Sequence, residues 1–258
     1  MQKYLCVFRL AILLSIRNYK SFIGLSIFMI ACILLFSQMW KVVSAKTTLT
    51  YTPQQLLWYL TFNEWILISM PRVQFNIEHD LRSGRLAYLL PRPISYLGSI
   101  FAEGAGTLLL NLIILGTVGF SFTWFCVGSV PLSPTAFLQA ITLGFLAAFV
   151  WLIFQMLVGV SAFWLQEVWS FNWVWEKLLF VLGGLILPLS IYPPWLQTLA
   201  SFTPFPSLLG QRSGLVFGND TGDILWIIVT LSLWGIVSLT TLLYLYKKGL
   251  RILNIGGG

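Results

Sequence analysis

The sequence is dominated by long apolar runs that contain almost no charged residues. Six such runs cover residues 22–40, 53–70, 96–125, 135–165, 178–191 and 224–246. A helix needs about 20 apolar residues to cross a bilayer. Only 9% of this chain is charged, whereas soluble domains have about 25%. We therefore predict an all-α integral membrane protein, a single transmembrane domain over residues 1–258 with six transmembrane helices.

The basic residues predict the orientation of these helices, because Lys and Arg gather on the cytoplasmic side of a membrane. With both termini in the cytoplasm, twelve of the fifteen basic residues fall inside, including Lys177 between the fourth and fifth runs. The other three are Lys41, Lys46 and Arg212. The net charge of +7 needs no nucleic-acid partner, since the basic residues lie at the ends of spans and not on a polar domain.

The N-terminal residues 1–20 alternate irregularly between apolar and basic side chains. Leu5, Phe8 and Ile12 follow helical spacing, which favours an N-terminal helix lying in the cytoplasmic interface. An extension of the first span is the alternative. Two arginines interrupt the apolar run and no small-residue cleavage site follows, so we do not expect a cleavable signal peptide.

A polar segment, residues 72–95, separates the second span from the third. It holds four arginines, Glu78, Asp80 and His79, which is the only histidine of the chain. So many charges must lie in water or against another protein, because charge is costly within lipid. Two interpretations remain open: a solvated connector whose arginines set the topology, or a cytoplasmic loop on which a soluble partner acts.

A second unusual segment, residues 188–223, precedes the last span. Its five prolines forbid one continuous helix, yet residues such as Trp195 make it too apolar for a solvated loop. We predict short helices that re-enter the membrane from the external side, where the broken backbone must be covered by protein or water. Gly210, Gly214 and Gly218 recur every four residues, as in a bare helix face for a close neighbour or as in turns and a helix stop.

The sequence carries no recognisable catalytic set. It lacks the phosphate-binding G-x-x-x-x-G-K-[ST] motif, paired histidines for zinc and a G-x-S-x-G elbow. Cys6, Cys32 and Cys126 have neither metal-ligand spacing nor an obvious disulfide partner, so we interpret them as small apolar residues.

Two carboxylic acids and two asparagines fall within the predicted spans, where an ionisable group costs about 2.5–3.5 kcal/mol at the bilayer centre. These candidates for a translocation path are Asn63, Glu64, Glu103 and Asn111. Glu64 could instead pair across a subunit interface. For Glu103 the favoured alternative is an ion pair with Arg85 or Arg92, and for Asn111 it is a hydrogen bond between helices.

Two stretches resemble the permeases of the type-2 ATP-binding-cassette exporter family. R-S-G-R-L-A-Y-L-L-P-R-P-I-S-Y (82–96) is similar to that family's first cytoplasmic loop. G-G-L-I-L-P-L-S-I-Y-P-P-W-L-Q-T-L-A-S-F-T-P-F-P (183–206) resembles its fifth span and the external helices that follow. With the span count, the resemblance covers essentially the whole chain. Pro91, directly before Arg92, is a departure that should stiffen the end of the loop.

The resemblance implies a bacterial permease that forms the translocation path as a homo- or heterodimer in the cytoplasmic (inner) membrane, surrounded by membrane lipids. Two cytoplasmic ATPase subunits would hold ATP and Mg²⁺ and push on a coupling helix. This chain would itself be no enzyme and would bind no cofactor. The residues implied in coupling are Asn76, Ile77, Glu78, His79, Asp80, Leu81, Arg82, Ser83, Gly84 and Arg85.

Within that segment the residue types fit a docking surface. Ile77 and Leu81 are four residues apart, so we expect one apolar ridge for a groove of the partner, inside a mixed-charge rim. Two other functions stay open. One is an intramembrane enzyme that modifies lipids or peptides with Glu64 or Glu103, and the other is the membrane subunit of an ATP-driven importer. The sequence does not identify the cargo, although its apolar spans favour an amphipathic or lipidic one.

Overall fold

The computed structural model describes residues 2–46, 51–165, 167–218 and 221–256. Within these ranges it consists of helices and turns and contains no strand, so the all-α prediction is confirmed. Asn219 and Asp220, near the end of the predicted external segment, lie outside the described residues.

Among the described residues, four helices are long and apolar enough to cross a membrane. They are α2 (Tyr19–Lys46), α6 (Tyr96–Val127), α7 (Pro134–Val160) and α12 (Thr221–Gly256). They coincide with the first, third, fourth and sixth predicted spans. In place of the other two the structure has α3 (Pro53–Ser69), with 17 residues, and α8 (Val168–Leu182), with 15. At 1.5 Å per residue these are only about 26 and 23 Å long, so a second and a fifth span remain predictions.

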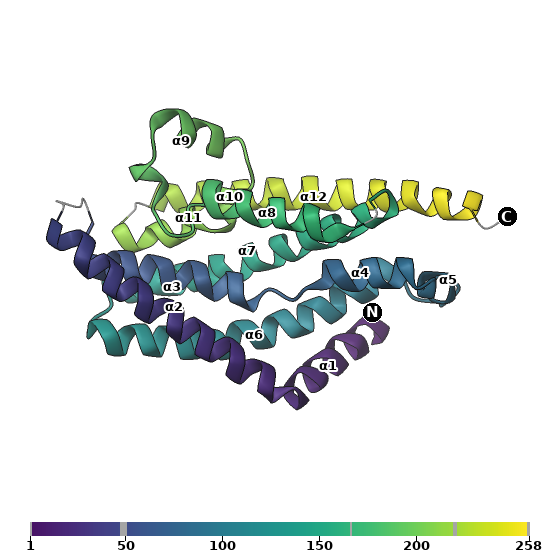
Figure 1. The fold of residues 1–258 in the computed structure, drawn as a ribbon, viewed down its shortest axis with the longest axis horizontal. Coiled ribbons are helices and arrows are strands. Elements are labelled where there is room, and N and C mark those ends of the chain that lie inside the picture. Colours follow the sequence, from purple (N-terminus) through teal and green to yellow (C-terminus); the bar gives the residue numbers. More distant parts are fainter. Residues whose placement is uncertain (1, 47–50, 166, 219–220, 257–258) are drawn as a thin grey trace.

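The N-terminal segment forms a separate helix, α1 (Gln2–Arg17), which meets α2 at a bend around Asn18 (Figure 1). α1 packs along α6 through two glycines. A Cβ atom on Gly106 would lie 2.6 Å from the carbonyl oxygen of Phe8, and one on Gly98 would lie 2.7 Å from the Tyr4 ring. The predicted N-terminal helix is therefore confirmed, and its location in the membrane interface stays a prediction.

Helix α3 lies in the interior of the bundle, packed against α2, α6 and α7. Its residues from Leu56 to Ile66 are all buried. The Trp65 indole donates to the Leu112 carbonyl at 2.8 Å, and its ring lies where a Cβ on Gly144 would come within 2.5 Å. Glycine at 144 thus makes room for the largest side chain at the α3–α7 crossing.

The segment after α7 differs from the prediction. Residues 166–177 were expected to form a loop and the fifth span to run to residue 191, but α8 begins at Val168 and ends at Leu182. A Glu78 carboxylate oxygen accepts a hydrogen bond from the Val168 amide at 3.4 Å, a contact that sequence spacing does not reveal. The chain then leaves the helix at Gly184, whose φ is +67°.

Lys177 consequently lies inside α8 and not in a cytoplasmic loop. Its amino group is 5.5 Å from the centre of the Trp173 ring, within range of a cation–π contact.

The proline-rich segment folds into short helical turns, as predicted, whereas its place in the outer leaflet stays a prediction. The turns are Leu189–Ile191, α9 (Pro194–Ser201), α10 (Phe205–Leu208), α11 (Gly210–Ser213) and Gly214–Phe217. α9 stands away from the bundle (Figure 1), with Trp195 67% exposed, while α10 and α11 are buried against the longer helices. A Cβ on Gly210 would lie 2.6 Å from the Gly183 carbonyl oxygen, whereas Gly218 (φ +88°) ends the last turn.

Two helices follow α3. They lie at the end of the bundle where α1 begins and α12 ends (Figure 1). They are α4 (Val73–Arg82) and α5 (Arg85–Leu89). α4 crosses α7 at Gly159, where a Cβ atom would lie 2.8 Å from Ile77 Cδ1 and 2.9 Å from the Cα of Gln74. Because one of these atoms belongs to the backbone, α4 itself would have to move to admit a side chain.

We expect the substitution Gly159→Ala to lower the unfolding temperature of the purified protein. Overpacking costs about 1–3 kcal/mol, which exceeds the gain of about 1 kcal/mol from the better helix propensity of alanine. Thermal unfolding in detergent measures the effect. Gly24→Ala in α2 is the matched control, since no atom lies within 4 Å of its Cβ position, and it should be neutral or stabilising. Equal stability of the two variants would contradict the close α4–α7 contact.

Candidate functional site

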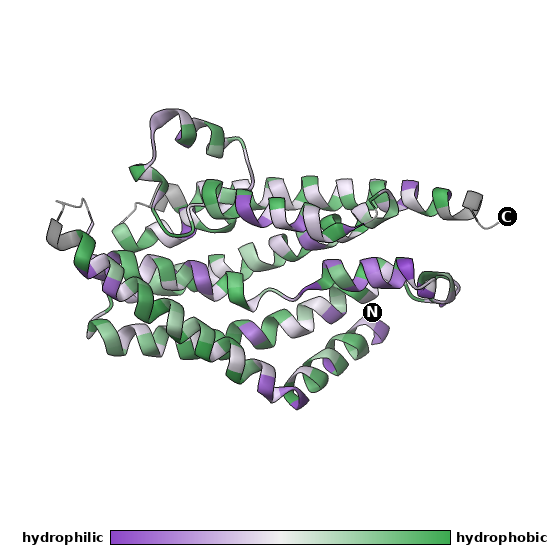
Figure 2. Ribbon diagram, viewed as in Figure 1, coloured by the Kyte–Doolittle hydropathy of each residue, from purple (hydrophilic) through white to green (hydrophobic). Residues whose placement is uncertain are grey.

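Among the helices of eight or more residues, α4 is the most hydrophilic (Figure 2). The segment after α5 lies beside the start of α1, since the Lys3 amino group donates to the Pro93 carbonyl at 3.3 Å. The start of α6 lies beside α12, because the ring centroids of Tyr96 and Tyr246 are 6.1 Å apart, and the Tyr96 hydroxyl in turn contacts Asp80 of α4. Residues 72–95 and the final basic residues of the chain thus form one charged end of the molecule.

The apolar side of α4 faces the bundle. Val73 and Ile77 are buried, with Ile77 only 1% exposed, and Leu81 packs against the same core. The predicted apolar ridge therefore does not point toward a partner protein, and that expectation is wrong. The small residues opposite, Gly104 and Gly159, leave the space that draws the ridge inward.

Polar contacts fix α4 to α5, α6 and α8. The buried Asp80 accepts a hydrogen bond from the Tyr96 hydroxyl at 3.0 Å and pairs with Arg85 at 3.5 Å. Glu78 pairs with Arg82 at 3.1 Å and accepts the Val168 amide at the start of α8. Because α4 contacts α6, α7 and α8, a displacement of α4 would be transmitted to all three.

The outer side of this end is exposed. The exposed residues of the predicted coupling set are Asn76, His79, Arg82, Ser83, Gly84 and Arg85. Gly84 adopts a φ of +71° at the turn between α4 and α5, a conformation that favours glycine. On α5, Leu86 is buried while Tyr88 is 80% exposed. Sequence reasoning missed Tyr88, whose only signal is an aromatic residue within a charged segment.

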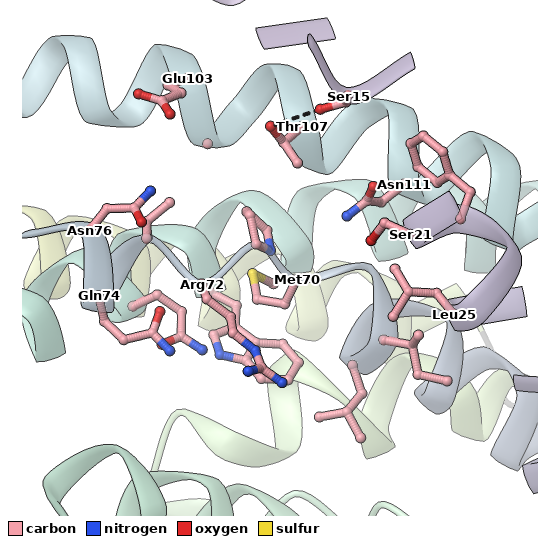
Figure 3. A pocket seen from close by; sticks show the side chains of 18 of the residues that line it. Ser15, Ser21, Leu25, Met70, Arg72, Gln74, Asn76, Glu103, Thr107 and Asn111 are labelled. Carbon is pink, nitrogen blue, oxygen red and sulfur yellow. Dashed lines mark hydrogen bonds between the residues drawn. The ribbon is translucent and has the colours of Figure 1, made fainter. Parts of the chain in front are cut away.

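A cavity of about 870 Å³ lies between the α1–α2 bend, the link from α3 to α4, and α6 (Figure 3). Its polar lining includes Arg72, Gln74, Asn76, Glu103, Thr107 and Asn111. A smaller cavity of about 450 Å³ shares Asn76 and Glu103 with it and reaches His79, Arg85 and Arg92 on the outer side. Both cavities lie beside α4, between the bundle and the charged end of the molecule.

Two of the four predicted path residues line the larger cavity. Asn111 does so while donating from Nδ2 to the Ser69 carbonyl at 2.8 Å, which is the hydrogen bond between helices expected as its alternative. Glu103 lines both cavities. Among the described residues Arg85 pairs with Asp80 and not with Glu103, although Arg85, Arg92 and Glu103 all line the smaller cavity.

The other two candidates, Asn63 and Glu64, lie on α3 outside these cavities. Asn63 donates to the carbonyls of Gly184 and Leu185 at 3.3 and 3.0 Å, and it accepts from the Ser213 hydroxyl at 2.5 Å. Its amide therefore holds the backbone break after α8 and α11 against α3. Glu64 is 5% exposed and has no hydrogen bond or ion pair within the described part of the chain.

Arg212 is fully buried, although sequence reasoning counted it among the basic residues on the external side. Its Nη2 atom donates to the Phe62 carbonyl at 2.8 Å and its Nε atom donates to the Leu208 carbonyl at 3.4 Å. Nη1 lacks a partner in the described ranges. Arg212 therefore has to be left out when basic residues are counted to infer the membrane orientation, because it is buried by helix packing and does not lie in a loop.

These features define a multi-pass membrane protein with a charged helical elbow, formed by α4 and α5 together, and an adjoining cavity. A family model described as "ABC-2 family transporter protein" matches residues 29–257. The match spans most of the chain, so the protein belongs to this family and is a transport permease, a membrane component that is not itself catalytic. It starts within α2, so α1 precedes the matched region. No curated protein matches the sequence significantly.

We expect Asn63→Leu to lower the unfolding temperature strongly. The change removes the amide that donates to the Leu185 carbonyl, while the Gly184 carbonyl keeps the Tyr59 hydroxyl and the Ser213 hydroxyl keeps the Leu209 carbonyl. A buried carbonyl that loses its donor costs about 1–3 kcal/mol. Thermal unfolding in detergent tests this. Gln54→Leu serves as the control, since Gln54 is exposed on the same helix. If both variants unfold at the same temperature, the Asn63 contacts do not stabilise the fold.

Proposed function

We propose that this chain is the permease subunit of an ATP-driven exporter, paired with a second permease and with cytoplasmic ATPase subunits that bind ATP and Mg²⁺. The family supplies the transport class. The proposed orientation places both termini and the charged end in the cytoplasm of a bacterial cell, following the excess of basic residues there. The second permease, from the same or a different chain, would cover part of the exposed apolar surface.

The observation that supports this function is the exposed tip of α5 on a firmly anchored α4. Tyr88 is 80% exposed and Leu90 41% exposed, and Arg82 and Arg85 lie beside them. Exposed aromatic residues together with arginine are enriched at protein interfaces. We therefore assign docking of the ATPase to the α4–α5 turn and α5, while the apolar side of α4 transmits force inward.

The connections between this elbow and the neighbouring helices are rigid, so a displacement of the elbow would be transmitted to them. Pro91 and Pro93 restrict the segment between α5 and α6, and the Tyr4 hydroxyl accepts a hydrogen bond from the Ser95 amide at 3.1 Å. A push on α5 would therefore reach α6 through this segment and reach α7 and α8 through α4. Such movement is the proposed link between nucleotide hydrolysis and the opening of the path.

The path itself is assigned to polar groups inside the bundle. Glu103 and Asn111 line the larger cavity, so they are the first candidates to meet cargo. Glu64 is buried without an ionic partner in the described residues, which suits a role at the path or at the permease–permease contact. Asn63 is occupied by contacts within the chain and would act by holding α3 in place.

The substitution Tyr88→Ala should reduce ATPase binding. We expect several-fold less ATPase to co-purify with the variant, because an exposed aromatic anchor is removed without disturbing the core. The control is Tyr244→Ala on α12, since Tyr244 is 66% exposed and lies outside the proposed docking surface. Equal ATPase recovery with all three proteins would exclude α5 from the interface.

The substitution Gly84→Pro should uncouple ATP hydrolysis from transport. Proline fixes φ near −65°, which is incompatible with the φ of +71° at this turn, whereas no other atom lies within 4 Å of the Cβ position. Membrane insertion should be normal, and export per ATP hydrolysed in reconstituted vesicles should fall. Wild-type export by this variant would remove the turn from the coupling route.

A further inference from the structure

The larger cavity has an apolar wall that opens toward the outside of α2. This wall consists of Phe22, Leu25 and Phe28 of α2, opposite Leu67 and Ile68 of α3. Phe28 is also 57% exposed, so the rim of the cavity reaches the surface of a helix that is apolar enough to lie in lipid. An acyl chain could follow this wall from the membrane into the cavity.

The opposite wall is polar, and its hydrogen bonding is incomplete. Gln155 on α7 is 4% exposed, and its Oε1 atom has no hydrogen-bond donor in the described ranges. One turn earlier, the buried Trp151 indole N–H has no acceptor in the same ranges. On α4, the Oε1 atom of Gln74 has no donor there either. All three residues line the cavity.

The orientation of the Gln74 amide follows from its neighbours. An ionised Glu176 carboxylate can only accept, so Asn172 donates its Nδ2 to it at 2.8 Å and turns its Oδ1 toward Gln74. Gln74 donates its Nε2 to that oxygen at 3.1 Å, which leaves Oε1 as an acceptor without a donor. An unpaired buried polar group costs about 1–3 kcal/mol, so a ligand that supplies the missing donor gains affinity.

The missing partners differ in kind. Gln74 needs a donor, Trp151 needs an acceptor, and the Gln155 amide offers both a donor and an acceptor. A phosphate without a proton only accepts and an ammonium group only donates, whereas a hydroxyl group does both. No hydrogen bond within the described residues fixes the last torsion of Gln155, so its amide can turn to engage a head group in the cavity.

We infer that the larger cavity binds an amphiphile whose head carries hydroxyl groups, such as a sugar- or polyol-headed lipid. The head lies between α4 and α7, and the chain lies along α2. The inference rests on the proposed function, since it names the class of cargo that the permease recognises. Val73, Gln74 and Asn76 of α4 form part of the same cavity wall. A bound head group would therefore contact the helix that is proposed to receive the push of the ATPase.

The test uses the full-length chain in phosphatidylcholine vesicles without any ATPase. The probe is a glucosyl-headed diacyl lipid with a photoreactive diazirine in its acyl chain, and mass spectrometry maps the crosslinks. We expect labelling on α2 at residues 22–28. Unlabelled glucosyl lipid and phosphatidylglycerol should compete, whereas phosphatidylethanolamine should not. Because binding is measured without hydrolysis, failure here is distinguishable from failure of the ATPase coupling.

The variant Gln155→Leu should reduce this labelling about 3- to 10-fold, the loss expected for one hydrogen bond. It should remain folded, since it removes a buried amide oxygen that has no donor in the described ranges. Gln139→Leu on the same helix lies outside the cavity lining and should label like wild type. Undiminished labelling of Gln155→Leu, competition by phosphatidylethanolamine equal to that of the glucosyl lipid, or labelling only outside residues 22–28 would each overturn the inference.

Discussion

A backbone that leaves the helical path among apolar helices must find its hydrogen-bond partners in side chains, because lipid supplies none. In this protein α3 provides them. The Tyr59 hydroxyl donates to the Gly184 carbonyl, and the Asn63 amide donates to two carbonyls directly after α8. The break after α8 and the short helices α10 and α11 can therefore be buried in the bundle. The interior position of α3 and the irregular segment depend on each other.

The charged elbow is held in place mainly by close helix packing over glycines. Four glycines let neighbouring helices approach the bundle closely: Gly98 and Gly106 receive α1, and Gly104 and Gly159 receive α4. Close packing over glycine gains many dispersion contacts without a side-chain entropy cost. The buried Asp80 then adds a polar tie to α6 through the Tyr96 hydroxyl. α4 is thus a charged helix with a tightly packed inner side, which suits a part that transmits force without unfolding.

The elements that sequence patterns predict correctly are those with a strong local signal. The long uncharged runs identify α2, α6, α7 and α12, and the concentration of charge identifies α4 and its surroundings. The predictions fail where the signal is not local. The loop expected at residues 166–177 is mostly α8, and the amide at its first turn donates to Glu78, about 90 residues earlier in the chain. Ile77 was expected to face a partner, but glycines on other helices give it a place inside.

In the candidate site, too, some residues were identified from the sequence and others only from the structure. Glu103 and Asn111 were identified by type alone, since polar residues are rare in apolar spans. Gln74, Trp151 and Gln155 escaped notice, because nothing in their neighbouring residues shows that their polar atoms lack partners. Their importance appears only when α4 and α7 are seen beside one cavity.

The sequence by itself determined that this chain is a helical membrane protein with one charged elbow, because hydrophobicity and charge act residue by residue along the chain. Only the tertiary structure decided which side of the elbow is buried, that Arg212 lies within the bundle, and that a cavity with unpaired polar groups adjoins α4. These properties depend on distances between residues far apart in the chain, and such distances are set by packing.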